Sequence, residues 1–285
     1  MSAGGSGRLC VLGSGSKGNS AVVCAGGEVV LVDLGLSPRL TEARLAQVGL
    51  SLGAVTGALL THLDMDHCHP GWCQGSGALP RGAEVCVAGA HGDRAGRRGL
   101  NGGRVRHFEG EFVTRGGLTV LPLMQLHDEL GVAAFRVGLP GRGWLGFATD
   151  IGRVTDELIA HLHGVDVLAI ESNYCPVMQA ASDRPGFLKR RIMGGWGHLS
   201  NQDAARATAA IEPREHAVFL HLSRDCNDPD LVWRMHEGAD YAVTISSADE
   251  PTRWVPVRPA AAPAGTLMGA AGGVGAQRAA RGVLW

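Results

Sequence analysis

Short apolar runs alternate with polar, glycine-rich segments along most of the chain. β-Branched and aliphatic runs predict strands over 8–15, 21–35 (a hairpin), 55–62, 84–89, 118–127, 132–139, 144–150, 165–172, 216–223 and 241–246. Capping signals and helical periodicity predict helices over 37–49, 155–163, 201–211 and 229–238. This interleaving of strands and helices is typical of one α/β domain, which we place at 7–255. The Ala/Gly/Pro-rich remainder, 256–285, cannot build a packed core and is predicted to be disordered.

Composition narrows the class of protein. The 285-residue chain has a formal net charge of −1, so no global positive field would draw it onto nucleic acid, and any polyanion site must be local. Its seven cysteines lack paired spacing, which favours a reducing, cytoplasmic compartment. The N-terminus lacks the apolar region of a signal peptide, and no apolar run reaches the ~18 residues of a membrane span. We therefore expect no membrane partner.

A glycine-rich stretch near the N-terminus matches a dinucleotide-binding pattern. GSGSKG, Gly13 to Gly18, fits G-x-G-x-x-G, and Asp33 closes the next strand. The pattern requires a helix after the glycines, whereas the strand-like NSAVVC follows. We interpret the stretch as a tight turn, or as a loop whose backbone N–H groups face an anion.

The densest chemistry lies in THLDMDHCHPG, Thr61 to Gly71. His62, Asp64, Asp66 and His67 all carry ligand atoms for zinc, manganese or iron. In an extended segment the first three side chains would project to one side, and a bend would add the fourth. This density predicts a metal site rather than a solvated His-rich loop, and His69 is expected to be an outer or exposed residue.

Two cysteines in the same region allow a rival interpretation. Cys68 and Cys73, with nearby histidines, could form a structural zinc knuckle. No second Cys/His pair follows at finger spacing, so we expect Cys68 to be a small apolar filler.

The stretch resembles the H-x-H-x-D-H signature of metallo-β-lactamase-fold hydrolases. The resemblance extends to Asp33 in VVLVDLG, His127 in QLHDELG, Asp150 in GFATDIG and His221 in VFLHLSRD, each at the end of a predicted strand. It covers about 7–250 and implies a four-layer αββα sandwich. GSGSKGNS, ESNYC, GHLSNQDAA and HLSRDCNDP resemble the WalJ/YycJ-type group, which implies a single-domain cytoplasmic exonuclease acting on DNA.

The resemblance also implies a ligand set for two divalent metal ions. His62, Asp64 and His127 would hold one ion, Asp66, His67 and His221 the other, and Asp150 would bridge them. Asp66 doubles as a candidate proton acceptor, and Asp33 would orient the His-rich loop. The family usually has His where this chain has Asp64. We expect Asp64 to remain a ligand, in a site that holds zinc or, because of the hard oxygen, manganese or iron.

His198 in GHLSN precedes a helix start, with Ser200 or Asn201 as N-cap. We predict that His198 binds the scissile phosphate or protonates the leaving oxygen, and that Ser200 and Asn201 help to bind substrate. A turn-capping role for His198 stays open.

Two basic clusters could contact a nucleic acid. HGDRAGRRGLNGGRVRH, 91–107, carries Arg94, Arg97, Arg98, Arg104 and Arg106, and Lys189, Arg190 and Arg191 form the second cluster. A solvated loop and an exposed helix face explain them equally well. We predict a two-metal phosphodiesterase or nuclease, most simply a DNA exonuclease. The alternative is a hydrolase of a small ester, thioester or lactone on the same fold, and a non-catalytic binding module would need a broken metal site.

Overall fold

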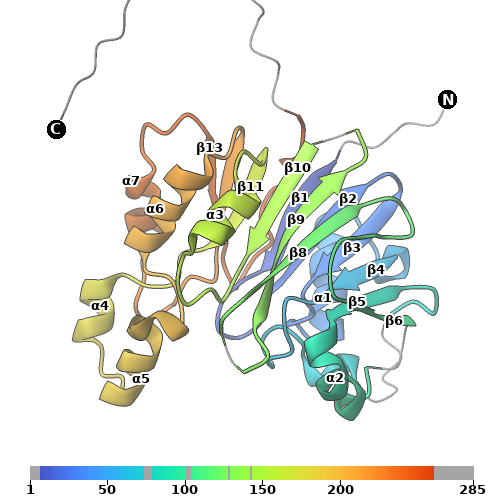
Figure 1. The fold of residues 1–285 in the computed structure, drawn as a ribbon, viewed down its shortest axis with the longest axis horizontal. Coiled ribbons are helices and arrows are strands. Elements are labelled where there is room, and N and C mark those ends of the chain that lie inside the picture. Colours follow the sequence, from blue (N-terminus) through green and yellow to red (C-terminus); the bar gives the residue numbers. More distant parts are fainter. Residues whose placement is uncertain (1–6, 74–78, 101–103, 128, 142, 260–285) are drawn as a thin grey trace, which may run out of the picture.

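Two β-sheets stacked face to face, each covered by helices on its outer side, form the molecule (Figure 1). The computed structural model describes residues 7–73, 79–100, 104–127, 129–141 and 143–259. In these ranges the strands form two sheets of seven. The predicted α/β class and four-layer αββα sandwich are confirmed.

The first sheet comes mainly from the N-terminal half and has the order β14-β1-β2-β3-β4-β5-β6. Its strands are β1 Arg8–Gly13, β2 Ser20–Ala25, β3 Glu28–Val32, β4 Gly57–Leu59, β5 Glu84–Ala88, β6 Arg104–Phe108 and β14 Val255–Pro256. The helical elements of this half are α1 Pro38–Gln47, η1 Leu52–Ala54, η2 Pro70–Trp72, η3 Gly89–His91 and α2 Gly92–Arg98. Strands β3 to β6 run parallel, so their carboxyl ends lie at one edge of the sheet.

The second sheet has the order β13-β12-β11-β10-β9-β8-β7. Its strands are β7 Phe112–Val113, β8 Thr119–Gln125, β9 Val132–Leu139, β10 Gly143–Ala148, β11 Val167–Glu171, β12 His216–Leu220 and β13 Ala242–Ile245. The helical elements of this half are α3 Asp156–Leu162, α4 Pro176–Ala181, α5 Gly186–Arg191, η4 Ile192–Trp196, α6 Asn201–Ile211 and α7 Pro229–Met235. Here β10 to β13 are parallel.

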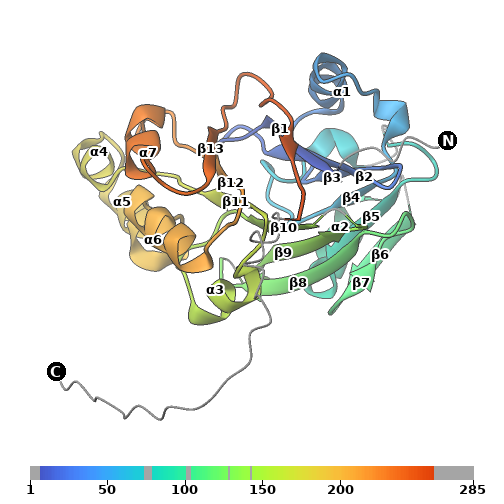
Figure 2. The same cartoon turned by 90° about the horizontal axis from the view of Figure 1, so that it is seen from above.

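Three apolar layers hold together the sheets and helices that Figure 2 shows from above. The central layer lies between the sheets and includes Val23 and Leu59 from one sheet and Phe135 and Val218 from the other. The outer layers pack each sheet against its own helices. The parallel strands of a sheet buried on both faces are near-continuous apolar runs, as β11 and β12 are apart from one polar residue at an end of each.

Local signals set the helix boundaries as the sequence predicts. Ser37 caps α1 by accepting a hydrogen bond from the Leu40 N–H, and Pro38 occupies the first turn. Thr155 caps α3 in the same way. None of the helices in the described part of the chain is long and apolar enough to cross a bilayer.

Three segments differ from the prediction. The stretch 92–98 is helix α2 rather than a loop, ending at Gly99 with a φ of 68°. The segment 176–196 forms α4, α5 and the π-helical η4, where no element was predicted. The predicted domain boundary after 255 falls inside β14, and buried Val257 donates its N–H to the Gly7 carbonyl. The rest of the predicted tail, 260–285, lies outside the described residues.

Candidate metal centre

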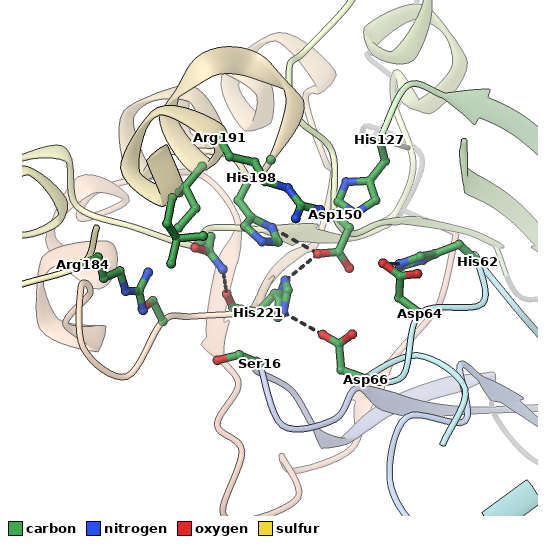
Figure 3. A pocket seen from close by; sticks show the side chains of 15 residues that line it. Ser16, His62, Asp64, Asp66, His127, Asp150, Arg184, Arg191, His198 and His221 are labelled. Carbon is green, nitrogen blue, oxygen red and sulfur yellow. Dashed lines mark hydrogen bonds and ion pairs between the residues drawn. The ribbon is translucent and has the colours of Figure 1, made fainter. Parts of the chain in front are cut away.

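A cavity of about 310 Å³ opens where strands of both sheets end (Figure 3). Six of the seven predicted metal ligands line it: His62, Asp64, Asp66, His127, Asp150 and His221. The seventh, His67, is fully buried behind them and contacts Asp150. All seven side chains therefore meet at one place, as the strand-end positions predict.

The His-rich segment follows β4 as a compact turn rather than an extended segment. The N–H groups of His67 and Cys68 both donate to the Asp64 carbonyl, at 3.0 and 2.7 Å. The turn, and not the alternation of an extended strand, therefore gathers the ligand side chains.

A first group of ligand atoms comprises His62, Asp64 and His127, which lie within 4.8 Å of one another. The hydroxyl of Thr61 lies 3.0 Å from Nδ1 of His62 and fixes that ring, leaving Nε2 directed at Asp64 Oδ2, 3.8 Å away. The Nδ1 atom of His127 is buried and has no hydrogen-bond partner among the residues that the structure describes. A buried nitrogen without a partner is costly unless a ligand satisfies it.

A second group comprises Asp66, His67 and His221. Oδ2 of Asp66 lies 3.7 Å from Nε2 of His67 and 3.6 Å from Nε2 of His221. Nε2 of His221 is also buried without a hydrogen-bond partner. Its Nδ1 is engaged by Asp150 at 2.9 Å, so Nε2 is the nitrogen left for a ligand.

Asp150 stands between the two groups. Its Oδ2 lies 2.5 Å from His67 Nε2, and it also belongs to a potential metal-binding group with His62 and His67. Burial alone raises the pKa of Asp150, but the charges of His221 and His67 outweigh it and hold that pKa well below the usual range. A carboxylate that stays ionised between two imidazole-rich groups can bridge two cations.

The donor set fits divalent metal ions. Each group offers imidazole nitrogen and carboxylate oxygen, which zinc, manganese and iron accept, and each group contains one buried, unpartnered nitrogen. Among the described residues, the groups that could hold an ion contain no cysteine, so the zinc-knuckle alternative finds no support. Cys68 is buried against the α1 side of the first sheet, and Nδ1 of His69 accepts a hydrogen bond from Gly71.

Backbone strain marks the ends of the strands that deliver the ligands. Asp33, Asp150 and His221 follow β3, β10 and β12, and their φ angles are 62°, 52° and 57°. Non-glycine residues adopt this left-handed conformation at a cost, and such residues gather at functional sites.

Asp33 supports the His-rich turn, as the sequence interpretation proposes. Its Oδ2 accepts a hydrogen bond from Nδ1 of His67 at 2.7 Å, and its Oδ1 accepts from the Thr61 N–H at 2.8 Å. One buried carboxylate thus fixes both ends of the turn and leaves Nε2 of His67 directed at Asp150.

The glycine-rich turn at 13–18 has a structural role beside the site. Strand β2 follows it, so the dinucleotide-binding interpretation fails. Asn19 accepts hydrogen bonds from the Ser14 hydroxyl and the Gly15 N–H, and donates its own N–H to the Asp66 carbonyl at 2.7 Å. The Ser14 hydroxyl in turn accepts from the His221 N–H at 2.8 Å. The turn therefore ties the Asp66 loop to the His221 loop, while Ser16 lines the cavity.

His198 lies in the same cavity, on the far side of Asp150 from His62 (Figure 3). Its Nδ1 lies 2.6 Å from Oε1 of Glu171 and 3.1 Å from Oδ1 of Asp150. Burial lowers the pKa of His198, but Glu171 and Asp150 more than compensate and raise it to about 9. Burial on its own raises the pKa of the Glu171 carboxyl. The charge of His198 outweighs that effect, so the pKa of Glu171 lies below its ordinary value.

Sequence reasoning missed Glu171. This fully buried residue closes β11, between the ends of β10 and β12 that carry Asp150 and His221. The rule that parallel strands present their carboxyl ends at one edge would have identified it.

Ser200 and Asn201, which the sequence predicts to help to bind substrate, lie outside the residues that line the cavity. Ser200 is the buried N-cap of α6, and its hydroxyl accepts from the Asp203 N–H. The Asn201 amide is buried and bonded to Asn227 and Ser172. Neither residue lines the cavity. Residues that cap helices or tie loops together are of the same types as residues that bind substrate, so the sequence alone does not distinguish the two roles.

The basic stretch 91–107 is partly engaged within the protein. Arg94 on α2 bonds Oδ1 of Asp64 at 2.7 Å, and Arg106 donates to the Val113 carbonyl. Residues 101–103 lie outside the described residues. Arg94 and Arg106 of the first cluster are therefore engaged within the protein, and Arg94 holds a candidate metal ligand.

Comparison with known proteins agrees with the fold. The family model of the beta-lactamase superfamily domain matches residues 29–222. Exodeoxyribonuclease YycJ of Bacillus anthracis is 31% identical over 228 residues, 78% of this chain and 84% of the relative. Exodeoxyribonuclease WalJ of Streptococcus pneumoniae is 29% identical over 235 residues, 79% and 84% of the two chains.

A solved structure shares the fold at low identity. The metallo-beta-lactamase fold protein YhfI from Bacillus subtilis superposes with a TM-score of 0.67 and 16% identity, covering 86% of this chain and 99% of that one.

Proposed function

The chain belongs to the beta-lactamase superfamily and is a metal-dependent hydrolase, and on that premise we propose that it is a two-metal exodeoxyribonuclease. The observation that carries the proposal is the pair of ligand groups joined by Asp150, with His198 in the same cavity. Two relatives named exodeoxyribonucleases support a DNA substrate.

The proposed ligands divide as the geometry groups them. His62, Asp64 and His127 would hold one ion. Asp66, His67 and His221 would hold the other, with Asp150 shared. When bound, the ions would supply Lewis acidity that activates a water and neutralises charge on the phosphodiester oxygens. We propose zinc, or manganese or iron at the group that contains Asp64.

Two side chains would move the protons. Asp66, whose side chain is 30% exposed, borders the cavity and can accept the proton of the attacking water. His198 can donate a proton to the leaving oxygen, because Glu171 and Asp150 stabilise its protonated ring. Glu171 has no exposed surface, so it acts as a positioning residue that fixes the ring of His198.

An assay with end-labelled DNA tests the proposal. Purified protein should release nucleotides from one end, and a chelator should abolish the release until a divalent metal is returned. A parallel thioester and lactone assay tests the alternative function. Hydrolysis of the thioester with no effect on DNA, at full metal content, would refute the nuclease assignment.

We also propose a cytoplasmic location. All seven cysteines are free, as suits a reducing compartment. Fractionation of the source cells with an antibody to the protein would test it.

A further inference from the structure

The cavity has a second wall that the metal centre does not use. Opposite Asp64 and His62, residues of the α4–α5–η4 segment close the cavity, and Arg184 and Arg191 belong to this wall (Figure 3). Apolar Leu188 and Ile192 line the same cavity. One wall is therefore rich in carboxylates and imidazoles, and the other presents two guanidinium groups.

Arg184 is held in place by its neighbours. Its Nη2 donates to the Ser223 hydroxyl at 3.1 Å and to Asp225 Oδ2 at 3.3 Å, and its Nη1 donates to Gln179 Oε1 at 3.2 Å. Ser223 also lines the cavity, two residues after His221. An arginine fixed in this way loses little entropy when it binds an anion.

Arg191 differs from the basic residues next to it. It lines the cavity, and among the described residues its guanidinium has no hydrogen-bond or ion-pair partner. Lys189 instead donates to the Ala180 carbonyl at 2.7 Å, and neither Lys189 nor Arg190 lines the cavity. Of the predicted basic cluster 189–191, only Arg191 is therefore placed to meet a substrate.

We propose that Arg184 and Arg191 form a second phosphate subsite, which binds the phosphate one nucleotide away from the scissile bond. The inference rests on the proposed function and deepens it. The scissile phosphodiester lies at the metal ligands, and the neighbouring phosphate of the same strand lies between the two guanidinium groups. Arginine suits this role because its planar donors match phosphate oxygens in pairs.

Short substrates that differ by one phosphate test the subsite. TpT has one phosphodiester, whereas pTpT and TpTp each add a terminal phosphate at one end. The wild-type protein should have a higher kcat/KM for one of the two extended substrates than for TpT. The ratio of these two values is the readout, because it cancels changes common to all substrates.

Arg191→Gln should lower this ratio by about 10- to 100-fold, as expected for loss of a hydrogen bond to a charged group. Arg190→Gln is the matched control, one residue away on the same helix and outside the cavity, and it should keep the wild-type ratio. Arg184→Lys should lower the ratio less than Arg191→Gln, because the ammonium keeps the charge but loses the paired donors.

Equilibrium binding provides a readout independent of turnover. Chelator-treated protein should bind the preferred extended dinucleotide more tightly than TpT, and Arg191→Gln should reduce the salt dependence of that binding by about one counterion. An unchanged ratio and unchanged binding in Arg191→Gln would overturn the subsite. Equal losses of kcat/KM on TpT, pTpT and TpTp in Arg191→Gln would also overturn the subsite. If the wild type cleaves none of the three, the end-labelled DNA assay decides the nuclease assignment, and the binding experiment still decides the subsite.

Discussion

Nδ1 of His198 lies 2.6 Å from Oε1 of Glu171, a carboxylate with no exposed surface at the end of β11. The same oxygen lies 3.2 Å from Nδ1 of His221. Glu171 therefore connects the loop before α6 with the loop after β12. In our proposal His221 would hold a metal ion and His198 would contact substrate, so the two roles can be separated by mutation.

His198→Ala should lower kcat on DNA by about 10²- to 10⁴-fold, the range typical of a lost general acid. The metal content should stay close to the wild-type value, because His198 lies on the Glu171 side of Asp150 rather than in either proposed ligand triad. Steady-state kinetics and elemental analysis of the same preparation would test this. A variant that lost its metal would show that His198 is a ligand, as a member of a further potential metal-binding group with Asp150, Glu171 and His221.

Replacement of Asp33 separates support of the ligands from backbone strain. Asp33→Asn can keep the φ of 62°, since Asn tolerates the left-handed region, but its amide cannot accept from both Thr61 and His67. We expect the metal affinity to fall by about 10- to 100-fold, as for other lost supports of a ligand.

Asp33→Ala is the matched comparison. It loses the same hydrogen bonds and also strains the backbone, so its free energy of unfolding should be lower than that of the Asn variant by about 1 kcal/mol or more. Metal titration and chemical denaturation of metal-free protein would measure the two effects. Equal metal affinity in wild type and Asp33→Asn would contradict the support role.

The strand ends could be predicted from sequence, because the strands are strongly apolar runs that have little choice of structure. The resemblance to the family then supplied the candidate ligands at those strand ends. The segment 176–196 could not. Its helices are short, and Pro185, Gly186, Gly194 and Gly195 interrupt any periodicity. The contact between Arg94 and Asp64 could not be predicted either, since only the folded chain shows that α2 brings the Arg94 guanidinium to Asp64.

His236 gives a test of stability that is separate from the metal centre. Its ring is buried and stacks on Phe219 with centroids 4.2 Å apart, and its Nδ1 lies 2.8 Å from the Tyr241 hydroxyl. Burial lowers the pKa of His236 below its ordinary value. The unfolded chain therefore binds a proton more readily than the folded one, and stability falls as pH falls below about 6.5.

His236→Gln should remove part of this acid sensitivity. Its free energy of unfolding, measured by denaturant titration from pH 8 to pH 5, should decline less than that of the wild type. His163→Gln is the control, because His163 is 57% exposed. Parallel pH profiles for the wild type and His236→Gln would contradict the prediction.

Asp64 is held by a partner that the usual His would not need. Nη2 of Arg94 bonds its Oδ1 at 2.7 Å, which leaves Oδ2 facing Nε2 of His62 at 3.8 Å. One oxygen is thus free to bind a metal in the group with His62 and His127, and the guanidinium offsets the charge that aspartate adds. We therefore expect two ions per wild-type chain and a loss of about one on Asp64→Ala.

The choice of metal should follow the ligand atom. Asp64→His replaces a hard oxygen by nitrogen, so the occupied site should shift from manganese or iron toward zinc when the ions compete at equal concentration. Arg94→Gln should weaken metal binding in the wild-type background more than in the Asp64→His background, since Arg94 orients the Asp64 carboxylate and cannot donate such a bond to a carboxylate that the imidazole replaces. Elemental analysis of the wild type, Arg94→Gln, Asp64→His and the variant with both changes gives this comparison directly. A single ion per chain that survives Asp64→Ala would mean that this group holds no metal, and that Arg94 and Asp64 form only an ion pair at the rim of a one-metal site.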